Sequence, residues 1–243
     1  MKNVIAGLAL ALTLPVALAD SGTARLSNLV VSLNGEAISD WSNQGTIQLA
    51  YIPADGEPFD ESATITGSES LTLDRPGAQL GVRADWASGL LESTATVTAR
   101  GAAYSGNTSR DTVGTEFLFL IPANGTLTFS ADALVSAATD FLCASDCFSN
   151  SFTSLTLQVG SQTFGDDLEV VAGESSTFES LTRRLSLSYT NNTGGEVYAR
   201  LSAYVDITGQ VAAVPEPETY ALMGLGLVGV MLQRARKARR AQA

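Results

Sequence analysis

The chain has 243 residues and a formal net charge of −11, with 25 acidic residues, 14 basic residues and no histidine. Nucleic acid repels so acidic a chain, so we expect no nucleic-acid partner. The lack of histidine excludes Ser-His-Asp and Cys-His catalytic arrangements. The only lysines, Lys2 and Lys237, lie near the ends of the sequence, so the region between them offers no lysine for a Schiff base.

The first 19 residues have the features of a secretory signal peptide. Lys2 precedes an apolar stretch over residues 4–18, which ends in a small-x-small pattern before Asp20. A charged start, a short apolar core and small residues at the end are the parts of such a signal. We therefore predict cleavage between Ala19 and Asp20, and export of the remaining chain through the export machinery.

Residues 20–213 are long enough for one exported domain with its own core. They contain 23 acidic residues and 8 arginines, and no long Pro/Gly/Ser-rich linker divides them. The dominant pattern is the alternation of apolar and polar residues, which is typical of strands with one buried face.

The first half of this region contains several such stretches. We expect the pair Asn34-Gly35 and a polar loop to join the first two, and Arg75-Pro76-Gly77 to interrupt a later one. Thr94, Thr96 and Thr98 form the polar side of another stretch, so we expect a threonine-lined exposed face. The predicted strands cover residues 29–33, 47–52, 65–73, 80–84 and 95–99.

The second half contains the clearest predicted hairpin, around Pro122-Ala123-Asn124-Gly125. Its Asn-Gly pair allows the positive φ of a tight turn. Residues 131–141 suit either a strand or one face of a helix, and we favour a strand. Strands of this number and spacing predict an all-β fold, an antiparallel β-sandwich of jelly-roll type. The predicted strands cover residues 117–121, 127–129, 131–137, 155–159, 163–164, 168–171, 185–189 and 197–207.

Cys143 and Cys147 are the only cysteines. Because export places them in an oxidising compartment, we predict a disulfide between them, which on the loop-entropy model contributes roughly 2 kcal/mol. Metal binding and redox exchange are the alternatives, but a metal site needs further ligands.

Two acidic sets are expected in loops: one from Asp55 to Glu61, and Asp166-Asp167 with Glu169. Clustered carboxylates can bind Ca²⁺, and two of them can act as acid and base in glycoside hydrolysis. In so acidic a chain we expect solvated side chains instead, hence no catalytic residue and no cofactor. The candidates for Ca²⁺ are Asp55, Glu57, Asp60, Asp166 and Asp167.

Residues 214–243 form a tail of three parts. The first, Val214-Pro215-Glu216-Pro217, is held extended by its prolines. An apolar run over residues 221–232 follows, in which we predict a single hydrophobic helix. A bilayer span needs ~20 residues, so Tyr220, snorkelling arginines or local thinning of the bilayer must cover the difference. The basic residues that hold the C-terminus on the cytoplasmic side are Arg234, Arg236, Lys237, Arg239 and Arg240.

This tail resembles the PEP-CTERM sorting signal of proteins exported by exopolysaccharide-producing Gram-negative bacteria. The resemblance rests on Pro215, Glu216 and Pro217, on residues 218–222, on three glycines in the apolar run and on the terminal arginines. It implies that an exosortase, a membrane transpeptidase, recognises and processes the tail. The domain would then be anchored in the inner membrane and face the periplasm before it reaches the outer cell surface or the extracellular space.

We therefore expect an exported, non-enzymatic protein of the cell surface or of the exopolysaccharide and biofilm matrix. One alternative is a carbohydrate-binding module that uses exposed Trp41 or Trp86 as a stacking platform, although we favour core burial for both. The other alternative is a glycoside hydrolase that uses loop carboxylates.

Overall fold

The computed structural model describes residues 19–114, 118–139, 147–173 and 176–212. The chain divides into two compact units, Met1–Ala212 and Ala213–Ala243, and all described residues belong to the first. The predicted signal peptide up to residue 18 and the predicted C-terminal helix lie outside the described residues.

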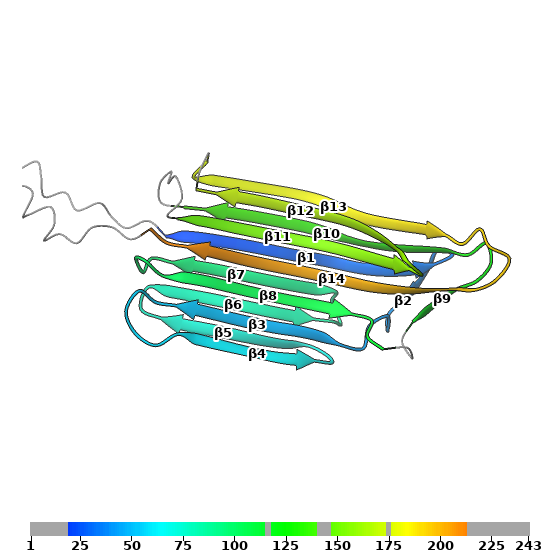
Figure 1. Ribbon diagram of the computed structural model, residues 1–243, viewed down its shortest axis with the longest axis horizontal. Helices are drawn as coiled ribbons and strands as arrows, with labels where there is room; N and C mark the ends of the chain where they lie inside the picture. Colours follow the sequence, from blue (N-terminus) through cyan, green and yellow to red (C-terminus); the bar gives the residue numbers. More distant parts are fainter. Residues whose placement is uncertain (1–18, 115–117, 140–146, 174–175, 213–243) are drawn as a thin grey trace, which may run out of the picture. The chain divides into compact units, whose positions relative to one another are not determined.

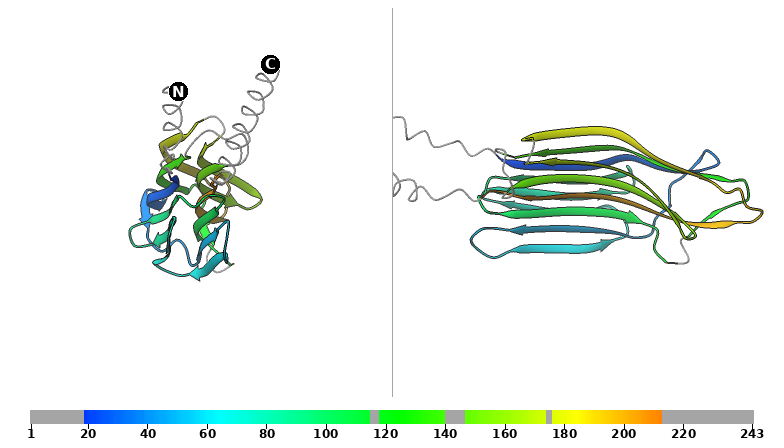
Figure 2. Two further views of the ribbon diagram at one scale, coloured as in Figure 1. Left: turned by 90° about the vertical axis from the view of Figure 1, so that its left-hand side faces the viewer. Right: turned by 45° about the horizontal axis from the view of Figure 1, so that its top comes forward.

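The described strands form two antiparallel sheets that pack face to face. The first sheet has the order β13-β10-β1-β7-β6-β5, and β2 pairs with β1. The second has the order β12-β11-β14-β8-β3-β4, and β9 pairs with β14. The long strands run nearly alongside one another (Figures 1 and 2). This arrangement confirms the predicted all-β fold and the antiparallel sandwich. The strands are β1 (Asp20–Leu33), β2 (Glu36–Ile38), β3 (Gly45–Ile52), β4 (Phe59–Ile65), β5 (Glu69–Arg75), β6 (Ala78–Asp85), β7 (Leu90–Val97), β8 (Ala103–Asp111), β9 (Phe119–Ile121), β10 (Thr126–Ala138), β11 (Phe148–Val159), β12 (Gln162–Ala172), β13 (Phe178–Thr190) and β14 (Val197–Gln210).

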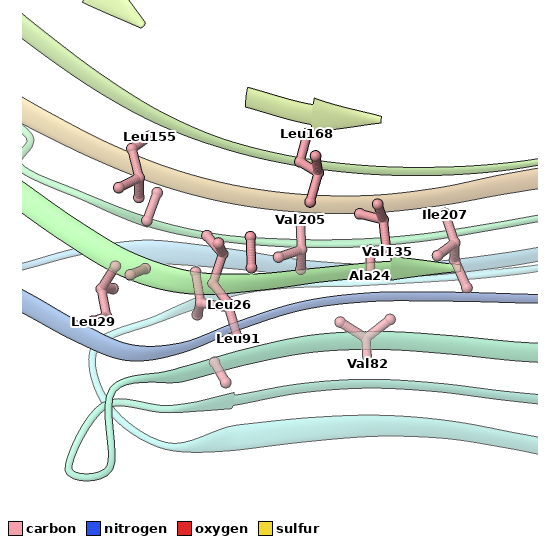
Figure 3. Close-up of a cluster of buried hydrophobic side chains, with 14 of the residues drawn as sticks. Ala24, Leu26, Leu29, Val82, Leu91, Val135, Leu155, Leu168, Val205 and Ile207 are labelled. Atoms are coloured by element: carbon pink, nitrogen blue, oxygen red, sulfur yellow. The ribbon is translucent and has the colours of Figure 1, made fainter. Parts of the chain in front are cut away.

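Apolar side chains from both sheets fill the space between them. In β14 every second residue over 199–207 is buried, which is the alternation that the sequence predicted. Figure 3 shows Leu155 and Val205 of the second sheet, and Leu26 and Val135 of the first, in the layer between the sheets. Each such side chain contributes roughly 1.5–3 kcal/mol when fully buried, so this layer is the main source of the fold's stability.

The polar faces of the strands point outward. On β7, Thr94 is half-buried and Thr96 is exposed, while exposed Thr98 follows the end of the strand. The predicted threonine-lined face is therefore confirmed. The strand interpretation of residues 131–141 is also confirmed as far as Ala138, where β10 ends.

The Asn34-Gly35 turn has a different partner from the one predicted. Both residues have positive φ, 54° and 87°, and they turn β1 back onto β2, with Leu33 opposite Glu36. The expected partner, β3, lies in the other sheet. The sequence did not reveal β2 because it has only three residues, none of them buried.

The predicted hairpin around Pro122-Ala123-Asn124-Gly125 is wrong, although the turn itself is present. Asn124 has a positive φ of 59°, and the Gly125 N–H donates a 2.9 Å hydrogen bond to the Pro122 carbonyl. However, β9 before the turn belongs to the second sheet and β10 after it to the first. Buried Asn191 holds this corner, because its Nδ2 donates to the carbonyls of Ile121 and Pro122. A turn signal gives the local φ but not the sheet that the next strand joins.

Strand β8 was not predicted at all, yet it lies between β14 and β3 in the second sheet. Its inward-facing residues are Tyr104, Gly106, Thr108 and Arg110, so it lacks aliphatic alternation. Gly106 is needed for close packing, since a Cβ there would lie 2.7 Å from the Ser93 hydroxyl and 3.0 Å from a Val82 methyl.

The first and last strands of the domain bring its two ends together. Gly209, near the end of β14, lies opposite Ser149 of β11, whose hydroxyl donates a 2.8 Å hydrogen bond to the Ser21 carbonyl at the start of β1. Val197 begins β14 at the other end of the sandwich. At ~3.3 Å per residue, the fourteen residues of β14 separate these ends by roughly 40 Å.

Candidate functional site

The two acidic sets lie at opposite edges of the second sheet. Asp60 is on β4 at one edge, and Asp166 is on β12 at the other, with four strands between them. A strand spacing of ~4.8 Å separates the edges by roughly 24 Å. Paired carboxylates in glycoside hydrolysis lie about 5–9.5 Å apart, so the two sets cannot form such a pair.

The expectation that the acidic residues lie in loops is wrong for most of them. Asp55 and Glu57 precede β4, but Asp60 and Glu61 lie within it, and Asp166, Asp167 and Glu169 lie within β12. These strands are at sheet edges and expose most of their side chains, so the apolar alternation that marks a strand is weak.

Asp166 has a structural role. Its Oδ1 accepts a 2.8 Å hydrogen bond from Arg183, and its Oδ2 accepts one of 2.8 Å from the backbone N–H of Ser186. Both partners lie on β13, the edge strand of the first sheet, so the carboxylate links the edges of the two sheets. It also accepts a hydrogen bond from a backbone N–H of this edge strand. No group of three or more His, Cys, Asp or Glu side chains that could hold a metal occurs within the described ranges. The structure thus does not bring the Ca²⁺ candidates together.

Both tryptophans contact one arginine. The Arg110 guanidinium lies 4.6 Å from the centre of the Trp41 ring and 4.9 Å from that of the Trp86 ring. Trp41 is 2% exposed and also packs edge-on against Phe129, while Trp86 is partly buried. The expected burial is confirmed for Trp41, whereas Trp86 is only partly buried, and both residues line an open groove of about 700 Å³.

Arg110 itself was not predicted as important. It is buried, and it donates hydrogen bonds to the Ser42 hydroxyl (2.6 Å) and to the carbonyls of Trp86 (3.2 Å) and Ser39 (3.3 Å). Burial lowers the pKa of the guanidinium, while nearby Asp40 raises it. The side chain thereby fastens the β2–β3 loop and the β6–β7 turn to the end of β8. No sequence signal was available, because the strand that carries Arg110 was not recognised.

A second buried polar group, Tyr104, links the two sheets at the other end. Its hydroxyl donates a 2.9 Å hydrogen bond to Ser149, which in turn bonds to the Ser21 carbonyl. Burial raises the pKa of Tyr104 to about 12, against the opposing effect of the Ser149 hydrogen bond. The backbone beside this ring must be glycine, because a Cβ on Gly209 would lie 2.3 Å from it.

We expect Tyr104→Phe to change how stability depends on alkaline pH. The raised pKa means that neutral Tyr104 stabilises the fold fully below pH 10, and that this contribution is lost as pH rises from 10 through 12. The stability advantage of the wild type over Tyr104→Phe should therefore shrink by about 2 kcal/mol by pH 12. Urea unfolding at pH 9 and pH 12 measures the difference. A constant difference would contradict the shifted pKa, and exposed Tyr198→Phe serves as the control.

Asp206 is a carboxyl group with a raised pKa. Burial is the main cause, and the Tyr204 hydroxyl opposes it by donating a 3.3 Å hydrogen bond to the carboxylate. The residues opposite Asp206 in the neighbouring strands are Phe152 and Asn107. Neither is a carboxylate, so the strand pairing supplies no partner for acid–base hydrolysis here.

An open groove of about 680 Å³ lies where β14 begins, beside the turn between β11 and β12. Tyr198, which is 56% exposed, and Arg200 follow one another on the same face of β14, about 7 Å apart. Gln158 lies directly opposite Arg200 on β11. Tyr189 forms another wall, and its ring lies 6.0 Å from that of Phe164.

The predicted processing sites fall mostly outside the described residues. This holds for the sorting residues Pro215, Glu216 and Pro217 and for the basic cluster that is predicted to stay on the cytoplasmic side. Asp20, which follows the predicted cleavage position, is buried and begins β1. Cys147 is buried, whereas Cys143 lies outside the described residues, so the disulfide stays a prediction. The described residues contain no helix with the length and hydropathy of a bilayer span.

Comparison with known proteins identifies one feature. Residues 213–237 match the family model of the PEP-CTERM protein-sorting motif. No curated protein and no solved structure matches the chain. The match covers the tail that the sequence indicated, and it does not include the sandwich domain.

Proposed function

We propose that this chain is delivered to the outer cell surface or to the exopolysaccharide matrix. The reason is that residues 213–237 form a PEP-CTERM sorting motif, which indicates an exported protein that is anchored in the membrane and sorted by an exosortase. At the surface or in the matrix, the sandwich domain is a structural or binding module and not an enzyme. The observation that carries this proposal is the position of the motif directly after the last strand, which ends at Gln210.

The geometry of the domain supports a non-catalytic role. The carboxylates considered for catalysis lie at opposite edges of the second sheet. Both oxygens of Asp166 already accept hydrogen bonds, one from Arg183 and one from the backbone N–H of Ser186. The outer face of β7 presents threonine hydroxyls, which suit weak, repeated contacts with a hydroxyl-rich polymer. The chain also crosses repeatedly between the two sheets, which supports a jelly-roll-like sandwich, an architecture that many extracellular binding domains share.

The test is co-sedimentation of the full chain, in a detergent without sugar headgroups, with polysaccharide from its own host. We expect the protein to sediment with the polymer while the number of reducing ends stays constant. Failure to sediment would contradict the matrix role. Release of reducing ends, abolished by Asp60→Asn or Asp166→Asn, would favour the hydrolase instead.

A further inference from the structure

The groove at the start of β14 combines an exposed aromatic ring with planar polar groups. Tyr198 presents its ring, while Arg200, Gln158 and Gln162 present groups that can form two hydrogen bonds each. Aromatic rings with a polar tip bind ligands that have one apolar face and many hydroxyls. The volume, about 680 Å³, is in the range of small-molecule sites, roughly 300–1,000 Å³.

Arg200 differs from the other arginines that the structure describes, because its guanidinium has no partner. Four of them form ion pairs: Arg25, Arg83, Arg183 and Arg184. The remaining three each contact another group: Arg75 lies over the Phe59 ring, Arg110 lies between two tryptophans, and Arg100 has a partner of its own.

Among its described lining residues, the groove carries no charge apart from Arg200. None of the described residues that line it is acidic, although residues 20–213 contain 23 acidic residues. An uncommitted guanidinium in a groove whose described lining holds no carboxylate can bind a carboxylate from outside. Those charges of the domain that lie more than ~8 Å from Arg200 are largely screened at physiological salt.

We propose that this groove binds a polysaccharide chain that carries carboxylate groups, that is, one with uronic acid residues. Tyr198 stacks on the face of one pyranose ring. Arg200 lies about 7 Å further along β14. Its guanidinium binds the carboxylate of the neighbouring sugar through two parallel hydrogen bonds, the bidentate geometry that arginine favours. Gln158, opposite Arg200, bonds to the adjacent hydroxyls. This inference rests on the proposed function, because it assigns the site through which the domain holds matrix polymer.

The experiment compares two probes that differ only in the carboxylate: hexagalacturonate and its carboxyl-reduced hexagalactose counterpart. Calorimetric titration of the full chain should give a Kd about tenfold lower for the acidic probe. Arg200→Gln should remove this preference, so that the two probes bind with equal affinity. Tyr198→Ala should weaken both probes about fivefold. A salt concentration of 0.5 M should reduce the preference without removing the contribution of Tyr198.

Arg83→Gln is the matched control, since Arg83 is also exposed but lies on the outer face of the first sheet and pairs with Asp85. It should bind both probes as the wild type does. Equal affinity of the wild type for both probes, an unchanged preference in Arg200→Gln, or binding of neither probe would overturn the inference. If neither probe binds while the protein still sediments with host polysaccharide, only the groove assignment fails. If sedimentation is also absent, the proposed function fails too.

Discussion

Replacing Pro215, Glu216 and Pro217 by alanine should leave the tail attached and the protein at the inner membrane. The residues after about Pro217 should be absent from the wild-type protein at the cell surface, in a host that has an exosortase. The reason is that the two prolines keep this segment extended and open to an enzyme, and alanines permit a helix to continue through it. Mass spectrometry of the surface and inner-membrane fractions measures both outcomes.

Gln210→Ala is the control for this experiment, because it changes an exposed residue at the end of β14, before the matched segment 213–237, and leaves the sorting motif intact. It should be processed as the wild type is. An intact C-terminus at Ala243 on surface-exposed wild-type protein would contradict processing by this route.

Arg110→Leu should lower the free energy of unfolding by about 3 kcal/mol. The substitution removes both contacts with the tryptophan rings and leaves the Ser39 and Trp86 carbonyls without their donors. For a domain of this size the melting temperature should fall by about 10 °C. Thermal unfolding followed by circular dichroism measures the shift, and tryptophan fluorescence reports on both rings.

Arg25→Leu tests whether this effect belongs to the buried site. Arg25 is exposed and pairs with Glu92 at 4.0 Å, a contact worth at most about 1 kcal/mol. Its substitution should change the melting temperature little. Similar losses in the two variants would show that Arg110 contributes only as an ordinary surface charge.

The sequence predicted those parts of the fold that depend on local pattern. β14 over residues 199–207 and β11 over residues 155–159 alternate buried aliphatic residues with polar ones, and both stretches were recognised. The first half of β11 was missed because its buried residues are Ser149, Ser151 and Thr153. β8 was missed because its inward positions are occupied by residues such as Gly106 and Arg110, which pack through shape and ring contacts and not through aliphatic alternation. Turn signals at Asn34 and Asn124 were correct in φ, but the partner of the following strand depends on contacts far along the chain.

The candidate site was less predictable than the fold. The acidic residues were conspicuous in the sequence, but strand order places the two sets at opposite edges. The groove residues gave no signal, because Gln158 and Arg200 are forty-two positions apart and become neighbours only through the pairing of β11 with β14. That Arg200 lacks a partner can be recognised only once the contacts of the other arginines are known.

The course of β14 has a mechanical consequence. Its first residues line the groove, its last residues lead to the sorting tail, and it lies between β11 and β8. A pull between a polymer held at Tyr198 and an anchor beyond Ala212 therefore acts along a single strand. The backbone hydrogen bonds to β11 over residues 199–210 and to β8 over residues 202–210 lie across that direction. Because β14 is already extended, its covalent backbone carries this tension, and the flanking hydrogen bonds hold the strand in place without having to break. We expect single-molecule pulling between positions 198 and 212 to leave the sandwich folded at forces that already peel the edge strand β4 from β3.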